Sequence, residues 1–231
     1  MQLVILCGGL ATRLGELCKN IPKSMILVDG KPFLEYQIEY AKKFGITDIV
    51  LCVGHLSDYI ENYFGDGHGF GISIRYSYDG DKLLGPIGAL KKAASYLDDV
   101  FFSLYGDSYV FIDYKNMHDV FFKKNSLGMM SVFQNFDKID SSNLLVSNQR
   151  VIKYNNKKTK DMTFIDYGLS IFRKNALEFI PKNEFFSTND FYSKLVEFDE
   201  LLAYEVKKRF YHIGNPSALG EFKSFVKNKK S

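Results

Sequence analysis

Two adjacent glycines near the start of the chain begin a segment whose residue types suit phosphate binding. In Cys7-Gly8-Gly9-Leu10-Ala11-Thr12-Arg13 the glycine pair allows a tight turn, so that successive backbone N–H groups can face an anion. Thr12 can donate a hydroxyl hydrogen bond, and Arg13 can form two hydrogen bonds to phosphate oxygens. The segment lacks the Gly-Lys-Ser/Thr of a Walker loop and the third glycine of the dinucleotide fingerprint. The glycine pair alone favours a structural turn, but with the Thr-Arg that follows the segment favours a phosphate loop.

A lysine follows a proline ten residues further along the chain. Pro22 excludes a helix at this point and holds the segment extended, which can direct Lys23 inward. A lone lysine is usually a solvated surface residue. Because it lies just behind a candidate phosphate loop, Lys23 is predicted to neutralise phosphoryl charge.

An aspartate follows the most apolar run in the middle of the chain. The segment Tyr105-Gly106-Asp107 ends that run. A carboxylate beside a glycine at the carboxyl end of a strand suits Mg²⁺, which usually takes one or two carboxylates together with phosphate oxygens. The alternative is an aspartate that only caps the next segment.

These three segments need a fold that brings them to one edge of a sheet. Short apolar runs alternate with helical patterns in the first half, which predicts strands over 3–7, 48–53, 72–78 and 100–105 and helices over 34–44, 58–64 and 88–97. Such alternation implies right-handed crossovers. We expect an α/β fold: a Rossmann-like three-layer α/β/α arrangement with a mixed, mainly parallel central sheet and ligands at the carboxyl ends of its strands.

The second half of the chain is less regular. Strands are expected over 129–133, 144–146, 151–154 and 168–172, and one helix over 191–198. The lysine-rich tail from Lys223 to Lys230 is expected to be a frayed, solvated helix end. The 231 residues contain no repeat or linker, so one domain is expected, with a nucleotide-binding half at about 1–110 and a half at about 111–231 that completes the sheet and shapes a second pocket.

The composition excludes several classes of protein. Hydrophobic residues make up 46% of the chain and charged residues 25%, which argues against long disorder and fibrous repeats. The net charge of +3 is too small to predict a nucleic-acid surface. No segment has the ~18 uncharged apolar residues of a membrane span, and the N-terminus lacks the cationic start of a signal peptide. Three cysteines without metal-ligand spacing fit a cytoplasmic protein in which Cys7 and Cys52 are packing residues.

Taken together, the motifs resemble those of the sugar-1-phosphate nucleotidyltransferases. The resemblance rests on Gly8-Gly9-Leu10-Ala11-Thr12-Arg13, Pro22-Lys23, Asp29-Gly30-Lys31-Pro32-Phe33-Leu34-Glu35 and Tyr105-Gly106-Asp107. It is dense over residues 1–110 and thinner afterwards, where 165–169 and 211–216 resemble the family's sugar-binding strand and closing segment. The segment Lys31-Pro32-Phe33-Leu34 is most similar to the corresponding segment of the D-glycero-D-manno-heptose 1-phosphate guanylyltransferase branch. The resemblance implies a GT-A-like nucleotidyltransferase fold.

The resemblance also implies a reaction and a division of roles. The phosphate of a sugar 1-phosphate would attack the α-phosphorus of a nucleoside triphosphate and release pyrophosphate, which requires positioning and charge neutralisation rather than a general base. Arg13, Lys23 and Asp107 would be catalytic, and Asp107 and His212 would hold Mg²⁺ or Mn²⁺. Further residues would bind the nucleotide (Leu6, Gly8, Gly9, Leu10, Ala11, Thr12, Asp79, Gly85 and Gly88) or the sugar phosphate (Tyr105, Gly106, Asn143, Lys157, Asp166, Tyr167 and Gly168).

Three features depart from the family pattern. His212 stands where the family usually has a metal-binding aspartate, and imidazole is a poor Mg²⁺ ligand; a histidine that only hydrogen-bonds nearby backbone is the alternative. The loop 84–89 differs from the commoner glycine-threonine-glycine-glycine-alanine version. Lys157 keeps the lysine register of the family's glutamate-lysine-proline motif, but the acid and the proline are missing, which weakens any inference about the sugar.

Two acids lie in the loop where this family reads the base. Guanine presents N1–H and N2–H donors side by side, which one carboxylate can accept, whereas uracil presents a single N3–H between two carbonyls. Asp79 and Asp81 therefore favour GTP, or CTP through its amino group. A solvated turn is the alternative.

We therefore expect an enzyme that joins GTP and heptose 1-phosphate into an activated sugar for surface glycans, as a monomer or homodimer without nucleic-acid or membrane partners. Two alternatives stay open. One is a transferase that uses CTP or UTP with another phosphorylated sugar or alcohol. The other is a nucleotide-binding module without turnover, which His212 would favour.

Overall fold

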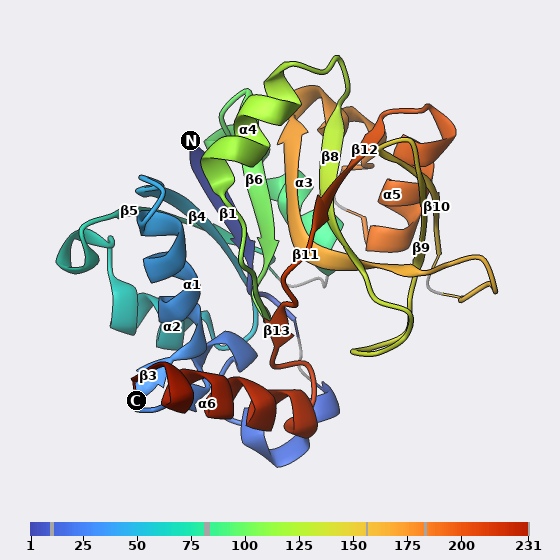
Figure 1. The fold of residues 1–231 in the computed structure, drawn as a ribbon. Helices are drawn as coiled ribbons and strands as arrows, with labels where there is room; N and C mark the ends of the chain where they lie inside the picture. The colour runs from blue at the N-terminus through green and yellow to red at the C-terminus, as the bar shows by residue number, and fades with distance from the viewer. Residues whose placement is uncertain (10–11, 81–83, 156, 183, 231) are drawn as a thin grey trace.

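In the part of the chain that the structure describes, nine strands form one mixed sheet (Figure 1). The computed structural model describes residues 1–9, 12–80, 84–155, 157–182 and 184–230, without the side chains of residues 12, 13 and 230. The strands are β1 (Gln2–Leu6), β4 (Asp48–Val53), β5 (Ser73–Tyr78), β6 (Val100–Tyr105), β8 (Gly128–Gln134), β9 (Leu144–Ser147), β10 (Arg150–Tyr154), β11 (Phe164–Arg173) and β12 (Leu201–Val206). They lie in the order β5-β4-β1-β6-β11-β8-β12-β10-β9, and all except β11 and β10 run in the same direction.

Three of the four parallel strands of the first half, β1, β4 and β6, are largely apolar and buried on both faces, whereas β5 at the edge of the sheet is partly exposed. On β1, Leu3, Val4 and Ile5 are fully buried, as expected for a parallel strand covered by helices on both sides. Leu3 pairs with Ile49 of β4 and with Phe102 of β6. These pairings bring the carboxyl ends of β1, β4 and β6 to the same edge of the sheet.

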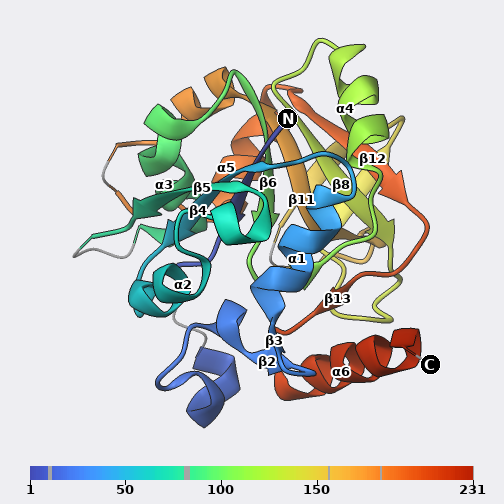
Figure 2. The same cartoon turned by 90° about the vertical axis from the view of Figure 1, so that its left-hand side faces the viewer.

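Helices cover both faces of the sheet, which confirms the expected three-layer α/β/α arrangement (Figures 1 and 2). One core contains residues of α1 (Phe33–Lys42), α2 (Ser57–Phe64) and α4 (Tyr114–Phe122). The core on the other face contains residues of α3 (Gly85–Lys92) and α5 (Thr188–Glu197). Figure 2 shows α3 and α5 on one side of the strands and α1 and α4 on the other. Shorter 3-10 turns are η1 (Thr12–Cys18), η2 (Lys23–Met25), η3 (His68–Phe70), η4 (Ala93–Tyr96) and η5 (Lys174–Phe179).

A third, smaller core lies beneath the C-terminal helix α6 (Pro216–Lys230). Leu219, Phe222 and Val226 of α6 are buried against residues that include Phe33 and Ile213. As expected, the tail from Lys223 to Lys230 is the end of a helix, and Lys223, Lys227 and Lys229 are exposed. The helix extends through Lys230, and its apolar residues recur at helical spacing on the buried side. Two short ladders lie beside this core: β2 (Leu27–Val28) with β3 (Lys31–Pro32), and β7 (Ser108–Tyr109) with β13 (Tyr211–His212).

Cys7 and Cys52 are packing residues, as predicted. Cys7 and Cys52 are buried and carry free thiols. They belong to the cores on opposite faces of the sheet, so their side chains point apart. None of the described helices combines the length and the apolar character that a bilayer crossing requires.

Candidate active site

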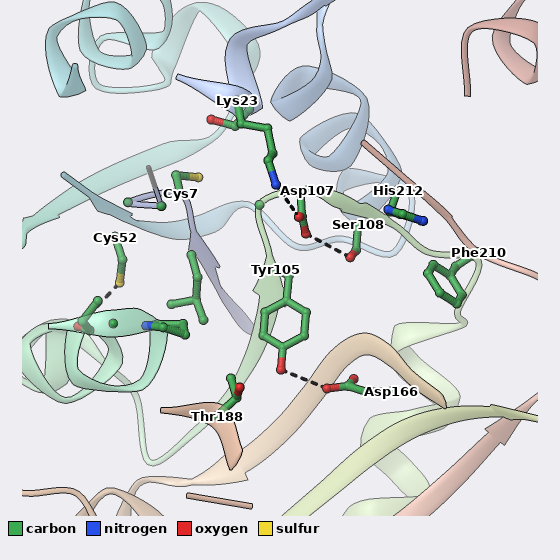
Figure 3. A pocket seen from close by; sticks show the side chains of 18 of the residues that line it. Cys7, Lys23, Cys52, Tyr105, Asp107, Ser108, Asp166, Thr188, Phe210 and His212 are labelled. Atoms are coloured by element: carbon green, nitrogen blue, oxygen red, sulfur yellow. Dashed lines mark hydrogen bonds and ion pairs between the residues drawn. The ribbon is translucent and has the colours of Figure 1, made fainter. Parts of the chain in front are cut away.

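A cavity of about 960 Å³ opens at the carboxyl ends of the parallel strands (Figure 3). The residues that follow β1, β5 and β6 line it, which is the predicted location for ligands in an open α/β sheet. It brings together most of the residues that the sequence singles out: Leu6, Gly8, Gly9, Lys23, Asp79, Gly85, Tyr105, Gly106, Asp107, Asn143, Asp166 and His212.

Part of the predicted phosphate loop belongs to the residues that the structure does not describe. Leu10, Ala11 and Asp81 lie outside the described residues, as do the side chains of Thr12 and Arg13. Their roles in holding phosphate or base stay predictions.

Four expected residues do not line the cavity. Tyr167 is fully buried on the other face of β11, where its hydroxyl accepts a hydrogen bond from the backbone N–H of Phe111. This corrects the expectation for Tyr167: successive side chains of a strand alternate between faces, so Asp166 faces the cavity and Tyr167 cannot. Gly88 packs beneath the 184–186 segment, and Lys157 is exposed. Gly168 follows Asp166 on β11 and has a φ of 99°. A Cβ at this position would lie 2.8 Å from the Cβ of Ser108, so only glycine fits.

A lysine and a carboxylate form an ion pair in the middle of the cavity. The Nζ of Lys23 lies 2.8 Å from Oδ2 of Asp107, and Figure 3 shows the two side chains pointing toward each other. Pro22 is extended at φ −60° and ψ 143°, as predicted, and starts η2 so that Lys23 faces inward. Both side chains are only partly exposed, 16% for Lys23 and 28% for Asp107. A phosphoryl group bound here would meet both a cation and a carboxylate able to hold a metal.

The turn that carries Asp107 is attached to the neighbouring strands through its backbone. The N–H of Gly106 donates to the carbonyl of Leu6 at 3.0 Å, and the carbonyl of Asp107 accepts from the N–H of Ile213 at 2.9 Å. A Cβ at Gly106 would lie 2.6 Å from the Leu6 carbonyl oxygen, so only glycine allows this approach. The close approach of this turn to β1 therefore explains why a glycine precedes Asp107.

His212 lies next to Asp107 and hydrogen-bonds nearby backbone. The β7–β13 ladder pairs His212 with Ser108, next to Asp107. Nδ1 of His212 accepts a hydrogen bond from the N–H of Gly214 at 3.1 Å, so a neutral ring carries its proton on Nε2. Over the described residues, no group of three or more His, Cys, Asp or Glu side chains could hold a metal. Asp107 is the carboxylate at this site that fits a hard oxygen-seeking ion.

The part of the cavity that follows β5 contains a buried carboxylate, Asp79. It is 8% exposed, and its Oδ2 lies 2.7 Å from the position of a Cβ at Gly8, so glycine is required at that position. Burial raises the pKa of Asp79 from 3.8 to about 6, and Lys92 opposes that rise. None of the described residues donates a hydrogen bond to this carboxylate, which leaves both of its oxygens able to accept from a ligand.

A second buried carboxylate, Asp166, lies on β11 at the other end. Its Oδ2 accepts from the Tyr105 hydroxyl at 2.9 Å and its Oδ1 from the N–H of Gly168 at 2.9 Å. Asn143 Oδ1 accepts from the backbone N–H of Asp166 at 3.0 Å. Burial raises the pKa of Asp166 to about 6 against these hydrogen bonds. The carboxylate is thus held in one orientation as an acceptor for hydroxyl groups.

Several cavity residues were not expected from the sequence: Asp140, Ser141, Phe185, Thr188 and Phe210. Phe185 is 64% exposed, and its ring would meet a Cβ at Gly85 at 2.8 Å. The backbone N–H of Phe186 donates to the carbonyl of Leu84 at 3.0 Å. A loop of the second half of the chain therefore packs against Leu84 and Gly85 at the edge of the cavity. Two adjacent aromatic residues, Phe185 and Phe186, in an otherwise polar loop are the feature of the sequence that could have predicted this contact.

The described residues of the cavity offer no activated nucleophile. Burial raises the pKa of the Cys7 thiol to about 12, so it stays protonated at neutral pH. The Ser108 hydroxyl donates to Asp107 Oδ1 at 3.3 Å, a long hydrogen bond to a carboxylate that already pairs with Lys23. The arrangement suits direct transfer between two bound substrates, with charge neutralised by fixed groups.

Comparison with known proteins identifies the family of the chain. The family model "nucleotidyl transferase" matches residues 2–229. The chain is 33% identical to the D-glycero-alpha-D-manno-heptose 1-phosphate guanylyltransferase of Campylobacter jejuni over 83% of this chain and 84% of that protein. It is 29% identical to the UTP–glucose-1-phosphate uridylyltransferase of Synechocystis over 85% of this chain and 55% of that protein. The structure of HddC from Yersinia pseudotuberculosis complexed with GMP-PN matches with a TM-score of 0.82 at 27% identity, over 97% of this chain and 99% of that one. The chain therefore belongs to the nucleotidyl transferase family.

Proposed function

We propose that the protein is a sugar-1-phosphate guanylyltransferase that converts GTP and a heptose 1-phosphate into a nucleotide-activated heptose and pyrophosphate. The observation that carries the proposal is the Lys23–Asp107 ion pair at 2.8 Å, in a cavity with a carboxylate at each end. The named activity of the Campylobacter jejuni relative supports guanine and heptose. The Synechocystis relative, which is named for UTP and glucose 1-phosphate, makes a uridylyltransferase the second candidate.

In this proposal the residues position charge rather than transfer protons. A sugar phosphate is already an anionic nucleophile at neutral pH, so the reaction needs in-line placement against the α-phosphorus. Lys23 would stabilise the charge that develops on the α-phosphoryl oxygens. Asp107 would hold Mg²⁺ together with phosphate oxygens, and the ion would neutralise the departing pyrophosphate.

Asp79 would read the base. Its buried carboxylate can accept both N1–H and N2–H of guanine, which would replace the water lost on burial. Uracil offers that carboxylate one donor flanked by two carbonyl oxygens that would repel it. The preference for GTP is therefore electrostatic in origin.

Asp79→Asn is expected to raise the KM for GTP about 10–100-fold, the usual discrimination of one bidentate pair. The amide keeps the shape but replaces one acceptor by a donor, which suits the N3–H and O4 of uracil. The KM for UTP should fall while the KM for the sugar phosphate stays the same. Steady-state kinetics with both nucleotides measure this. Equal KM values for GTP in the variant and the parent would remove Asp79 from base recognition.

The pH dependence of GTP binding is expected to follow Asp79. Its pKa of about 6 means that the carboxylate is an acceptor above pH 6 and becomes an O–H donor below it, so GTP affinity should fall between pH 7 and pH 5. The pKa in the folded state lies above the ordinary 3.8, so ionisation of Asp79 opposes folding at neutral pH. Asp79→Asn should therefore raise the melting temperature at pH 7 and remove this step in GTP affinity. A step that persists in the variant would belong to another group.

Pyrophosphate release measured with four nucleoside triphosphates and a panel of sugar 1-phosphates tests the whole proposal. The expected result is turnover with GTP and a heptose 1-phosphate that exceeds every other pairing. Faster turnover with UTP would establish the second candidate. GTP binding without pyrophosphate release from any pairing would identify a nucleotide-binding module.

A further inference from the structure

A buried glutamine holds both ends of the turn that carries Asp107. Gln37 lies on α1 and is 2% exposed. Its Nε2 donates to the carbonyl of Tyr105 at 2.8 Å and to the carbonyl of Ser108 at 2.7 Å. These two carbonyls flank Gly106 and Asp107, so one side-chain amide sets the distance across the turn.

The orientation of the amide is determined by its partners. Reversing it would place Oε1 against two carbonyl oxygens, so the NH₂ group must face the turn. Over the described residues, Oε1 then has no hydrogen-bond partner, although it is buried. A buried unpaired acceptor is unfavourable, and an apolar side chain would avoid it.

The position of Gln37 in the sequence also points away from a packing role. The buried stripe of α1 contains Phe33, Leu34, Ile38 and Ala41, and Gln37 occupies a position in it where an apolar residue is expected. An apolar residue there would leave the carbonyls of Tyr105 and Ser108 without this donor. What the glutamine supplies is the shape of the turn.

We propose that Gln37 is a positioning residue that presents the Asp107 carboxylate to Lys23 and to a metal–nucleotide complex in one geometry. The inference rests on the proposed role of Asp107 as the metal ligand. Gln37 acts through the backbone alone: it touches neither the carboxylate nor, on this arrangement, the substrates. Replacing Gln37 should therefore lower the affinity of the site for a divalent ion more than its affinity for the nucleotide.

Gln37→Met tests this, because methionine keeps the length and the burial but removes both donors. Outer-sphere partners of metal sites typically change metal affinity or activity about 10–100-fold when they are lost. We expect that reduction in the affinity for Mn²⁺, measured by electron paramagnetic resonance with a non-hydrolysable GTP analogue present. The half-saturating Mg²⁺ concentration for turnover should rise in parallel, while the affinity for the nucleotide without metal changes less than about twofold.

Gln2→Met is the matched control. Gln2 is also fully buried, and its Nε2 also makes two donations, to Asp48 and to the carbonyl of Tyr96. It lies at the amino end of β1, away from the cavity lining. Both variants should lose stability, but only Gln37→Met should lose Mn²⁺ affinity.

Equal Mn²⁺ affinity in Gln37→Met and Gln2→Met would overturn the inference and leave Gln37 a structural residue. If Gln37→Met does not fold, the same titration on the isosteric Gln37→Glu decides, because an ionised carboxylate donates to neither carbonyl and a protonated one donates to one of them at most. The Mn²⁺ titration needs no turnover. A parent protein that binds Mn²⁺ but turns over no substrate pair would therefore refute the proposed function and leave this inference standing.

Discussion

Lys23→Ala is expected to lower kcat about 10²–10³-fold, with a much smaller change in the KM for the nucleotide. The structure supplies the reason: Nζ of Lys23 is held 2.8 Å from Asp107, in the middle of the cavity and largely out of water. A cation fixed there costs no reorganisation when charge builds on the α-phosphoryl group. Its loss should therefore appear in the transition state more than in the bound substrate.

A second lysine provides the control for Lys23→Ala. Lys31 also forms a lysine–carboxylate pair, with Glu39 at 2.6 Å, but on the surface and outside the cavity lining. Lys31→Ala removes the same charge and should leave kcat unchanged, since exposed pairs contribute little. An unchanged kcat with a raised KM in Lys23→Ala would show that Lys23 binds only ground-state phosphate.

The first half of the fold could be predicted because most of its strands are apolar and buried on both faces. The predicted bounds for 48–53 and 100–105 coincide with β4 and β6, and the other strands of this half agree within a residue or two. In the second half, α4 and β12 were missed. Tyr114, Met117 and Phe121 of α4 do recur at helical spacing, but polar residues separate them, and their burial depends on α1.

The site could be predicted where it depends on chain topology, and not where it depends on tertiary contacts. Parallel strands bring the turns after Leu6 and Tyr105 together whatever the loops do, so Lys23 and Asp107 could be anticipated from local motifs. Phe185 reaches the cavity because its loop folds back onto Gly85, which no local pattern specifies. The alternation of side chains along a strand would have been enough to predict that Asp166 and Tyr167 point to opposite faces of the sheet, so that only one of them can line the cavity.

The state of His212 shows why the chemistry of a residue depends on its hydrogen bonds. A histidine at the position of the family's aspartate suggested a metal ligand. The N–H of Gly214 takes the lone pair of Nδ1, and this contact forms only once the 212–214 segment turns after β13. The sequence contains both residues but not that geometry.

Asp107→Asn is expected to remove most turnover, a loss of about 10³-fold or more, because it takes away the carboxylate that faces both Lys23 and the proposed metal. The fold should survive. The turn is held by backbone hydrogen bonds to Leu6 and Ile213, and these do not involve the side chain of Asp107. The variant should therefore keep its melting temperature within a few degrees of that of the parent. Its kcat should fall, and excess Mg²⁺ should restore only part of it. Measuring kcat over a range of Mg²⁺ concentrations tests both expectations.

The control for this variant is Asp113→Asn. Asp113 caps α4 by accepting from the N–H of Asn116, and asparagine caps equally well, so the same loss of charge should leave turnover unchanged.

Combining Lys23→Ala with Asp107→Asn tests whether the two groups act together. If both groups act on one phosphoryl transfer, the double variant should be scarcely slower than the worse single variant, whereas independent roles would multiply the two losses. Wild-type turnover and Mg²⁺ dependence in Asp107→Asn would exclude this carboxylate from the reaction.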